Sequence, residues 1–380
     1  MKIVMIYPNF QSEKGISNYS LTLINGIKRQ EVDIDGLTFI RGKPSTINLK
    51  NISKYDTIHV QHEYNLLGWF GIPYFFLLGY LWLLKNKSLV ITMHTILSQN
   101  EKFKSGKIKT FLRKILYKIQ NRFIDWTCDK IIVHSKVFKN ILVEEYFIPK
   151  EKIEVIHHPI IENIKTLSKQ KARKELNIKE NEKVYLLIGT MIPDHGQDKI
   201  IRQADKIKGK ILVATNPSTI NYKNIEKIKS YLELNKKLAR NSKNVRFDLG
   251  EISNEKWWKY FSACDLVLLP YQGGIGSGIF ADAMVMKKPV VSSTNNYFWD
   301  IATDYSCVMT SKNYPCAIEL AMEEENYEKM VKECERYVKE NGITPISKRY
   351  KDFYSNLKEP TDWTYSPEFE AFPRGRFYAE

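Results

Sequence analysis

Short runs of β-branched and other apolar residues alternate along the chain with longer segments that have helical periodicity. This alternation is typical of a parallel sheet whose strands are joined by crossover helices. In the first half it predicts helices at Ser17–Lys28, Lys107–Thr127 and Lys136–Glu145. The predicted strands are Lys2–Tyr7, Asp33–Ile40, Thr57–Gln61, Leu89–His94, Lys130–His134 and Glu154–His157. Residues 1–165 are therefore predicted to form one doubly wound α/β domain.

The same pattern begins again after a polar, lysine-rich stretch at residues 164–182. It predicts strands at Lys183–Gly189, Lys210–Ala214, Val245–Leu249, Asp265–Leu269 and Pro289–Ser292. We predict a second doubly wound domain over residues 166–345, joined to the first by a linker near residues 160–170. Open α/β sheets bind ligands at the carboxyl ends of their strands, so two such domains that face each other predict a ligand-binding cleft.

Residues 346–380 form a third predicted segment, which begins with a helix at Ile346–Leu357. The tail that follows is rich in aromatic side chains, namely Trp363, Tyr365, Phe369, Phe372, Phe377 and Tyr378. Such a tail either packs on the surface of a domain or is disordered, and the pattern does not decide between the two.

One segment, Leu66–Leu84, contains 19 residues without a charge and is flanked by Lys85 and Lys87. Three interpretations stay open: a helix packed within a globular domain, a helix that lies in a membrane interface, and a transmembrane helix. The glycines and the proline inside the segment weaken the transmembrane interpretation. The strand-like segments on both sides favour a helix that belongs to one globular domain.

Charge is distributed unevenly along the 380 residues, which carry 58 Lys and Arg against 43 Asp and Glu, a formal net charge of +15. Residues 1–165 contain 24 basic and 14 acidic side chains, and residues 102–122 contain eight basic and no acidic ones. Basic proteins commonly bind nucleic acid, anionic membranes or phosphorylated ligands. No interleaved basic and aromatic motif of a nucleic-acid-binding module occurs, so we expect no nucleic acid partner. The basic cluster near the uncharged segment predicts peripheral contact with an anionic membrane.

The composition, with 43% hydrophobic and 12% aromatic residues, excludes a disordered or low-complexity chain. The five cysteines are scattered without a CxxC pair, which favours a reducing compartment over a disulfide framework or a zinc site. The apolar run at the N-terminus ends at Pro8 and is too short for a signal peptide. We therefore predict a cytoplasmic protein, and the basic first domain extends this prediction to the inner face of the membrane.

Two glycine-containing elements are candidate anion sites, while a GxGxxG dinucleotide fingerprint after the first strand and a P-loop are both absent. Gly15 lies in the turn after the first strand, where backbone N–H groups can hold a phosphate or sugar oxygen; an ordinary strand-to-helix turn fits equally well. Residues 269–278 contain four glycines before a helix predicted at Ile279–Met286, whose N-terminus favours an anion. Asp282 in that helix would repel a phosphate, but its carboxylate suits the two hydroxyls of a ribose.

The order and local sequences of these elements resemble the retaining, nucleotide-sugar-dependent glycosyltransferases of family 4. The matching stretches are Lys14-Gly15-Ile16, Gln61-His62-Glu63-Tyr64, Thr92-Met93-His94-Thr95, Ile156-His157-His158-Pro159, Gly189 to Gly196, Ser277 to Met284 and Lys288-Pro289-Val290-Val291. The resemblance implies the GT-B fold, an α/β architecture of two facing, doubly wound Rossmann-like domains with a cleft between them. It also places the acceptor in the first domain and the nucleotide sugar in the second.

The resemblance assigns roles to individual residues of this sequence. Gly15 is expected to approach the diphosphate and sugar of the donor, and His94 to lie near the transferred sugar. Asp282, shorter than the usual glutamate, is expected to bind the ribose. The backbone amides expected to cradle the diphosphate are those of Ser277, Gly278 and Ile279.

The sequence departs from the family pattern at three positions. The first of two acidic residues falls on Gly274, and the arginine and lysine that usually neutralise the diphosphate fall on Thr190 and His195. Each lost cation removes charge-assisted hydrogen bonds of about 1.5–3 kcal/mol. A histidine replaces such a cation only when it is protonated. Either other cations (Lys199, Arg202 or Arg246) contact the diphosphate, or the protein is a weak or non-catalytic relative.

The predicted function is therefore a hexosyltransferase of polysaccharide biosynthesis, which moves a sugar from a UDP- or GDP-linked donor to a glycan or lipid-linked acceptor with retention of anomeric configuration. The alternative is a non-catalytic, GT-B-like partner subunit that binds sugars or nucleotides. The sequence contains neither HExxH nor an acidic cluster suited to a metal-bound diphosphate, so we expect no metal and no cofactor besides the donor substrate.

Overall fold

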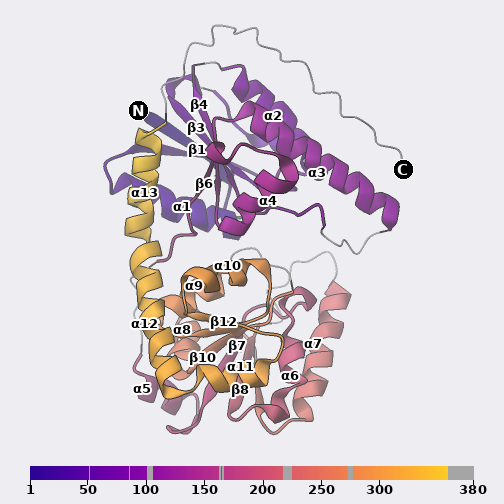
Figure 1. Cartoon of the computed structure of the whole chain (residues 1–380), viewed down its shortest axis with the longest axis vertical. Coiled ribbons are helices and arrows are strands. Elements are labelled where there is room, and N and C mark those ends of the chain that lie inside the picture. The colour runs from indigo at the N-terminus through magenta and orange to yellow at the C-terminus, as the bar shows by residue number, and fades with distance from the viewer. Residues whose placement is uncertain are drawn as a thin grey trace, which may run out of the picture.

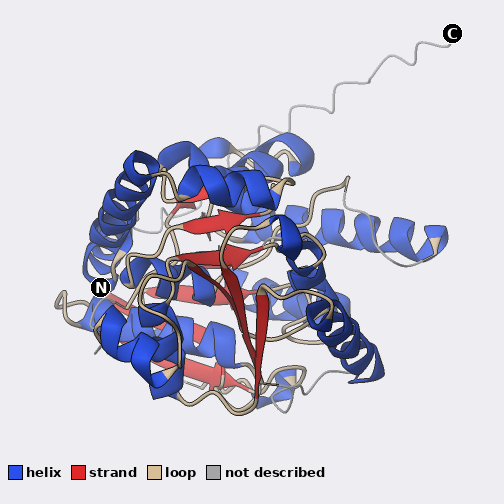
Figure 2. Cartoon of the chain, turned by 90° about the horizontal axis from the view of Figure 1, so that it is seen from below, coloured by secondary structure: helices blue, strands red, loops and turns tan. Residues whose placement is uncertain are grey.

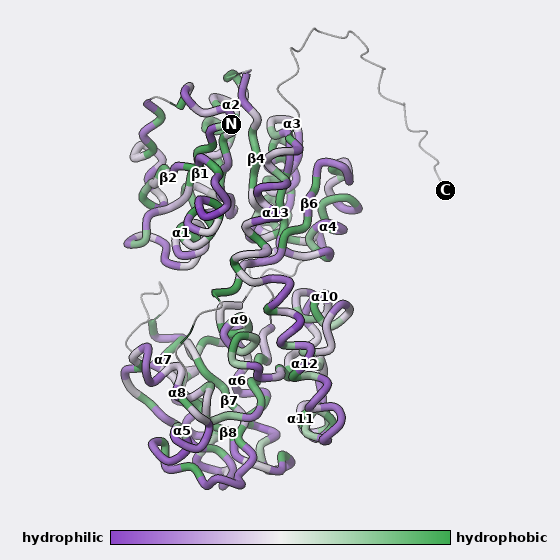
Figure 3. Tube along the Cα trace, turned by 90° about the vertical axis from the view of Figure 1, so that its left-hand side faces the viewer, coloured by the Kyte–Doolittle hydropathy of each residue, from purple (hydrophilic) through white to green (hydrophobic). Residues whose placement is uncertain are grey.

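The computed structural model of the chain describes residues 1–50, 52–84, 86–100, 106–161, 164, 167–216, 225–272 and 277–357. Two six-stranded parallel sheets lie one above the other along the longest axis of the molecule, and helices cover both faces of each sheet (Figures 1 and 2). Hydrophobic residues gather along strands such as β4, whereas the outer helices are largely hydrophilic (Figure 3). This is the two-domain α/β architecture that the alternating pattern predicts.

The first sheet has the strand order β2-β1-β3-β4-β5-β6, with every neighbouring pair parallel. Its strands are β1 (Lys2–Pro8), β2 (Asp33–Phe39), β3 (Thr57–His62), β4 (Ser88–Met93), β5 (Lys130–Val133) and β6 (Ile153–Val155). All residues of β3 and β4 are buried, as expected for central strands of a sheet that is covered on both faces.

The second sheet has the order β12-β11-β10-β7-β8-β9 and is also parallel throughout. Its strands are β7 (Val184–Ile188), β8 (Lys210–Thr215), β9 (Val245–Leu249), β10 (Leu266–Leu269), β11 (Val290–Ser292) and β12 (Val308–Thr310). All predicted strands are confirmed to within a few residues. The edge strand β12 was not predicted.

Crossover helices join these strands. In the first domain they are α1 (Lys14–Lys28), α2 (Ile72–Trp82), α3 (Lys107–Thr127) and α4 (Lys136–Tyr146). In the second sheet they are α6 (Gln197–Ile201), α7 (Ile225–Arg240), α8 (Asn254–Ala263), α9 (Gly278–Val285) and α10 (Asn296–Asp304). Helix α5 (Lys169–Glu175) precedes β7, and α11 (Tyr314–Ala321), α12 (Glu324–Asn341) and α13 (Ile343–Ser355) follow β12.

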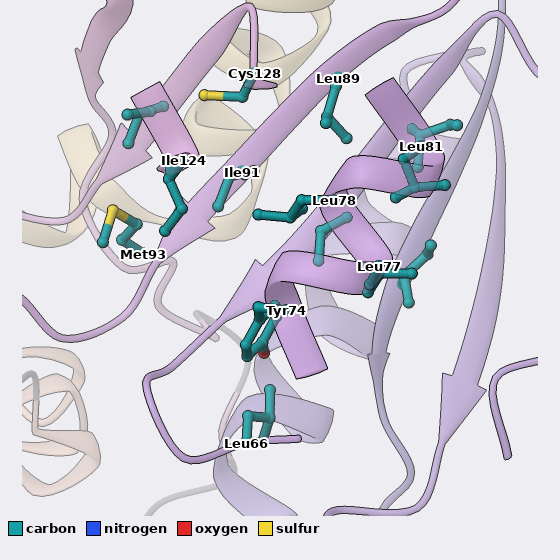
Figure 4. Packing of buried hydrophobic residues seen from close by; sticks show 14 of the residues in the cluster. Leu66, Tyr74, Leu77, Leu78, Leu81, Leu89, Ile91, Met93, Ile124 and Cys128 are labelled. Carbon is teal, nitrogen blue, oxygen red and sulfur yellow. The ribbon is translucent and has the colours of Figure 1, made fainter. Parts of the chain in front are cut away.

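The uncharged segment contains the short helix α2, which packs on the first sheet with one face only. Tyr74, Leu78 and Leu81 point from α2 toward β4 in the core (Figure 4), while Trp69 and Phe76 remain 80% and 76% exposed. Within the described residues, no helix is long and apolar enough to cross a membrane. The interpretation as a helix of a globular domain is confirmed, with an unusually apolar outer face.

The last helix, α13, returns from the second domain to the first. Ile346, Tyr350 and Tyr354 are fully buried against β1 and α1, in the same hydrophobic cluster as Ile3 and Tyr19. Residues 346–355 therefore complete the core of the first domain and do not stand as a separate segment. The aromatic tail predicted after this helix lies outside the described residues.

The two domains touch at the carboxyl edges of their sheets. Lys136, which begins α4 after β5, donates its backbone N–H to Asp300 Oδ2 at 2.8 Å, and its Nζ lies 2.5 Å from Asp304 Oδ2. Both aspartates belong to α10, which follows β11. The two chain crossings also pair, because Ile343 N–H donates to Ile160 O at 2.8 Å. These contacts hold the carboxyl edges of the two sheets toward each other.

Candidate active site

His94 follows β4 at the carboxyl edge of the first sheet. Its backbone N–H donates to His62 O at 3.0 Å, which extends the ladder one residue beyond the strand. Its Nε2 lies 2.8 Å from Gln61 Oε1. An amide oxygen only accepts hydrogen bonds, so Nε2 carries the proton and Nδ1 keeps a free lone pair. The side chain is held in one orientation, as a residue that positions a ligand requires.

His94 is uncharged at neutral pH. Burial holds its pKa well below the usual range, and the neighbouring His134 and His158 lower the pKa further. The ring meets Tyr19 edge-on at 4.9 Å and lies 5.1 Å from the ring of His134. A neutral imidazole in this setting can accept a hydrogen bond from a sugar hydroxyl at Nδ1, but it cannot act as a cation toward a phosphate.

The ring of His94 packs against a buried aromatic cluster that the sequence analysis did not identify. Tyr19 of α1 is fully enclosed, and its hydroxyl lies 2.8 Å from the hydroxyl of Tyr350 in α13. His134 donates its Nδ1–H to the carbonyl of Ile156 at 2.9 Å. Burial lowers the pKa of this ring to about 3, although that hydrogen bond acts in the opposite direction, so His134 is neutral. Tyr19 and Tyr350 are 331 positions apart, so no local pattern could have joined them.

His62, the last residue of β3, and Glu63, which follows it, have different surroundings from those of His94. The ring of His62 lies on the opposite face of the sheet, 4.3 Å from the ring of Tyr74 in α2. Burial raises the pKa of Glu63, and the guanidinium of Arg41 opposes that rise. His62 therefore packs within the first domain.

The Gly15 turn opens helix α1 next to this site. The side chain of Glu13 caps the helix by accepting from Gly15 N–H at 3.3 Å, and it also forms an ion pair with Arg41. A Cβ added at Gly15 would meet only the Glu13 carboxylate, at 3.5 Å. The space beside Gly15 is therefore open. The backbone N–H of Gly15, which the donor was predicted to approach, is already hydrogen-bonded to the carboxylate of Glu13.

On the second domain, the N-terminus of α9 presents the predicted diphosphate site. Ser277 caps the helix, because its Oγ accepts from Phe280 N–H at 3.2 Å and lies 3.3 Å from the hydroxyl of Tyr271. A Cβ added at Gly278 would meet none of the described residues within 4 Å. The amides of Ser277, Gly278 and Ile279 thus begin a helix beside open space. Gly274, where the family has its first acid, lies outside the described residues.

Asp282 lies one turn further into α9. The indole N–H of Trp257, from α8, donates to Asp282 Oδ2 at 3.0 Å. Burial raises the pKa of Asp282 to about 6, although the Trp257 hydrogen bond acts in the opposite direction. One carboxylate oxygen is therefore held by the protein, and Oδ1 is available to a ribose hydroxyl. Trp257 is a site residue that the sequence analysis did not identify.

The loop after β7 carries Thr190 and His195 in place of the family's cations. Gly189 has a φ of +109°, and a Cβ there would lie 2.6 Å from Ile279 Cδ1, so the loop packs closely on α9. His195 Nδ1 lies 2.7 Å from Thr190 O, and its ring stacks on Tyr271 at 4.5 Å. Burial lowers the pKa of His195. The idea that a protonated His195 replaces the missing lysine is therefore not supported.

The three cations considered as replacements have different partners. Arg202 lies 3.5 Å from Asp198, and Arg246 lies 3.0 Å from Asp248, so both are matched by acids of their own. Lys199 instead binds the side-chain oxygen of Gln272, the residue directly before the glycine-rich loop. Among the described residues, no three His, Cys, Asp or Glu side chains are grouped to hold a metal ion.

Comparison with protein families explains this arrangement. Residues 38–162 match the family model described as Glycosyltransferase Family 4, and residues 168–342 match that of Glycosyl transferases group 1. The chain belongs to glycosyltransferase family 4. It is a retaining glycosyltransferase that uses nucleotide-sugar donors, and the two matches meet at the predicted linker. No curated protein matches the sequence.

Solved structures show the same fold as this glycosyltransferase. HepE from Anabaena, in complex with UDP, is 14% identical and has a TM-score of 0.67, with 94% of this chain and 100% of HepE covered. Sucrose-phosphate synthase from Thermosynechococcus elongatus is 14% identical, with a TM-score of 0.70 and coverage of 94% and 99%. WaaG, a glycosyltransferase involved in lipopolysaccharide biosynthesis, is 13% identical, with a TM-score of 0.59 and coverage of 93% and 100%. The fold is GT-B.

Proposed function

We propose that the donor is a UDP-sugar bound between the two carboxyl edges, with GDP-sugars as the competing possibility to be tested. Asp282 Oδ1 binds the ribose, and the amides that open α9 hold the diphosphate. The sugar then points toward Gly15 and His94 on the first domain. The observation that carries this proposal is the pairing of an open helix N-terminus with a held carboxylate, one turn apart in α9. The UDP complex of the structurally similar HepE supports the choice of base.

In the reaction, the acceptor hydroxyl attacks the anomeric carbon while the bond to the diphosphate breaks. The protein contributes positioning and stabilisation of the departing diphosphate. His94 accepts a hydrogen bond from a hydroxyl of the transferred sugar at Nδ1, because Gln61 holds the Nε2 proton. This contact orients the sugar and requires the neutral imidazole that burial maintains.

Lys199 takes the place of the missing family cations in this proposal. It lies in α6, bound to Gln272 at the entrance to the glycine-rich loop, whereas Arg202 and Arg246 are paired with acids. The Gln272 side chain is uncharged, so no acid of the described residues competes with a diphosphate for this contact of Lys199. One charge-assisted contact of this kind contributes about 1.5–3 kcal/mol.

The acceptor is proposed to be a glycan or lipid-linked sugar at an anionic membrane surface. Helices α2 and α3 pack together on one flank of the first domain (Figure 1). The outer side of α3 exposes a stripe of apolar side chains, Ile108, Phe111, Leu112, Ile115 and Ile119. Lysines and arginines lie between them along the helix. An apolar stripe with flanking cations is the composition of helices that lie in a lipid interface.

Two experiments test the proposal. A thermal-shift comparison of UDP, GDP and their glucose conjugates identifies the base, because a ligand that binds only the folded state raises the melting temperature. No shift with either nucleotide would contradict the donor site. Flotation with anionic and neutral vesicles at low and high salt tests the membrane surface. Phe111→Ser/Ile115→Ser should abolish flotation, and Leu320→Ser, an exposed apolar residue of the second domain, serves as the matched control.

A further inference from the structure

An apolar pocket of about 480 Å³ lies between the loop after β2 and helix α2. Its walls include Ile47, Leu49, Leu67, Trp69, Phe76 and Leu77. The volume falls within the range of about 300–1,000 Å³ that is typical of pockets for small ligands. A pocket with these walls favours a hydrocarbon chain and offers few partners for a sugar.

The pocket opens at the same edge of the first sheet as the Gly15 turn. Its walls come from the segments that follow the carboxyl ends of β2 and β3. The N–H of Gly42 donates to Leu66 O at 2.9 Å, which ties the two segments together. Arg41, next to Gly42 in the chain, pairs with Glu13 at the start of α1. A ligand in this pocket would therefore have its polar end close to the donor turn.

The charge around the pocket complements an anionic head group. Residues 40–50 contain Arg41, Lys43 and Lys50 and no acidic residue, and all three cations are exposed. Trp69 and Phe76 line the pocket and at the same time belong to the exposed apolar face of α2. The pocket is thus continuous with the surface proposed to meet the membrane. Lys43 lies in the chain between the lining residues Gly42 and Pro44, and Lys50 directly follows the lining residue Leu49, whereas Arg41 is paired with Glu13.

We propose that this pocket binds the first part of the hydrocarbon chain of a lipid-phosphate-linked acceptor. The rim lysines, Lys43 and Lys50, hold the phosphate, and the attached sugar extends toward His94. This inference rests on the proposed lipid-linked acceptor and names the part of the acceptor that the protein recognises. Recognition of the chain and its phosphate would let one site accept a lipid-linked sugar and reject the free sugar.

Calorimetry with farnesyl phosphate, farnesol and inorganic phosphate tests the pocket without membranes. The wild-type chain is expected to bind farnesyl phosphate at least about tenfold more tightly than either farnesol or phosphate alone, since both parts contribute. Leu49→Trp fills the pocket from the partly buried loop and should weaken binding at least about tenfold. Ile108→Trp, on the exposed stripe of α3, should bind like the wild type. Equal binding by the filled variant, or by phosphate alone, would overturn the proposal.

Two further measurements separate the pocket from the membrane proposal and from misfolding. Lys43→Glu/Lys50→Glu changes only exposed side chains and should weaken farnesyl phosphate binding without affecting farnesol. Turnover with a vesicle-bound acceptor should lose apparent affinity for that acceptor in Leu49→Trp, while flotation stays unchanged. If Leu49→Trp still floats and its apparent affinity for the vesicle-bound acceptor is unchanged, the proposed role of the pocket is refuted while the membrane proposal stands. If the wild type neither floats nor uses lipid-linked acceptors, the proposed acceptor is refuted. The calorimetric binding of farnesyl phosphate would still show whether the pocket binds a lipid phosphate.

Discussion

The hydrogen bond from Trp257 to Asp282 offers a direct test of the ribose site. Trp257→Phe keeps an aromatic ring in α8 but removes the N–H that lies 3.0 Å from Asp282 Oδ2. Hydrogen bonds to charged groups contribute about 1.5–3 kcal/mol, and we take about 1.4 kcal/mol because solvent reaches this carboxylate. This free energy corresponds to about one pKa unit. The pKa of Asp282, about 6 in the wild type, should therefore rise to roughly 7 in the variant.

The consequence is a donor affinity that depends on pH. If the ionised carboxylate binds the ribose, its population at pH 6.5 falls from roughly 76% to roughly 24%, so KM for the donor should rise about threefold. At pH 8 both forms of the enzyme are almost fully ionised, and the difference should fall to about 1.1-fold. The assay is KM for a UDP-sugar, measured for the variant and the wild type from pH 5.5 to 8.5.

Trp258→Phe provides the matched control, because this neighbouring indole packs on Phe261 at 5.9 Å from ring to ring and its N–H is not the one bound to Asp282. A pH profile of Trp257→Phe that coincides with the wild-type profile would refute the reasoning. An equal rise in KM at every pH would also refute it, since that result points to a lost contact without a change in ionisation.

Three further predictions concern other parts of the molecule. His94→Ala should lower kcat about 100-fold while the circular dichroism spectrum stays that of the folded wild type, because a positioning contact is lost; a rate within threefold of the wild type would remove His94 from the site. Lys199→Gln should raise KM for the donor about tenfold or more, with the acid-paired Arg202→Gln as control; equal effects of both changes in steady-state kinetics would contradict the assignment of Lys199. Tyr350→Ala should destabilise the chain by about 3–5 kcal/mol in urea unfolding, because it empties a fully buried site between α13 and α1; a loss under 1 kcal/mol would show that α13 is not part of this core.

The sequence alone was sufficient to predict both sheets and the family. Strands such as β3 and β4 are buried on both faces, so their apolar runs are continuous and easy to recognise. His94 follows strand β4, Ser277 caps helix α9 and Asp282 lies inside that helix. The order of the elements along the chain indicated the family. These features depend on residues within a few positions of one another, which is the range over which sequence patterns are informative.

The partners of the site residues depend on contacts that no local pattern contains. Trp257 reaches Asp282 across 25 positions, and Tyr19 meets Tyr350 across 331. The partners of the cations are also set by the fold. Lys199 contacts the uncharged side chain of Gln272, whereas Arg202 pairs with the carboxylate of Asp198. The charge distribution identified the first domain as the more basic one, but it did not identify which cations the fold pairs with acids.

Helix α3 shows most clearly which properties follow from the sequence and which depend on the tertiary structure. The sequence predicted its bounds, Lys107–Thr127, and its basic character. A helix with apolar residues on more than one side can bury either side, and periodicity does not choose between them. The tertiary structure buries Tyr117 and Ile124 against the domain and leaves Ile108 and Phe111 at the surface. Only packing against α2 and the sheet decided which stripe faces outward, and that stripe is the surface proposed to meet the membrane.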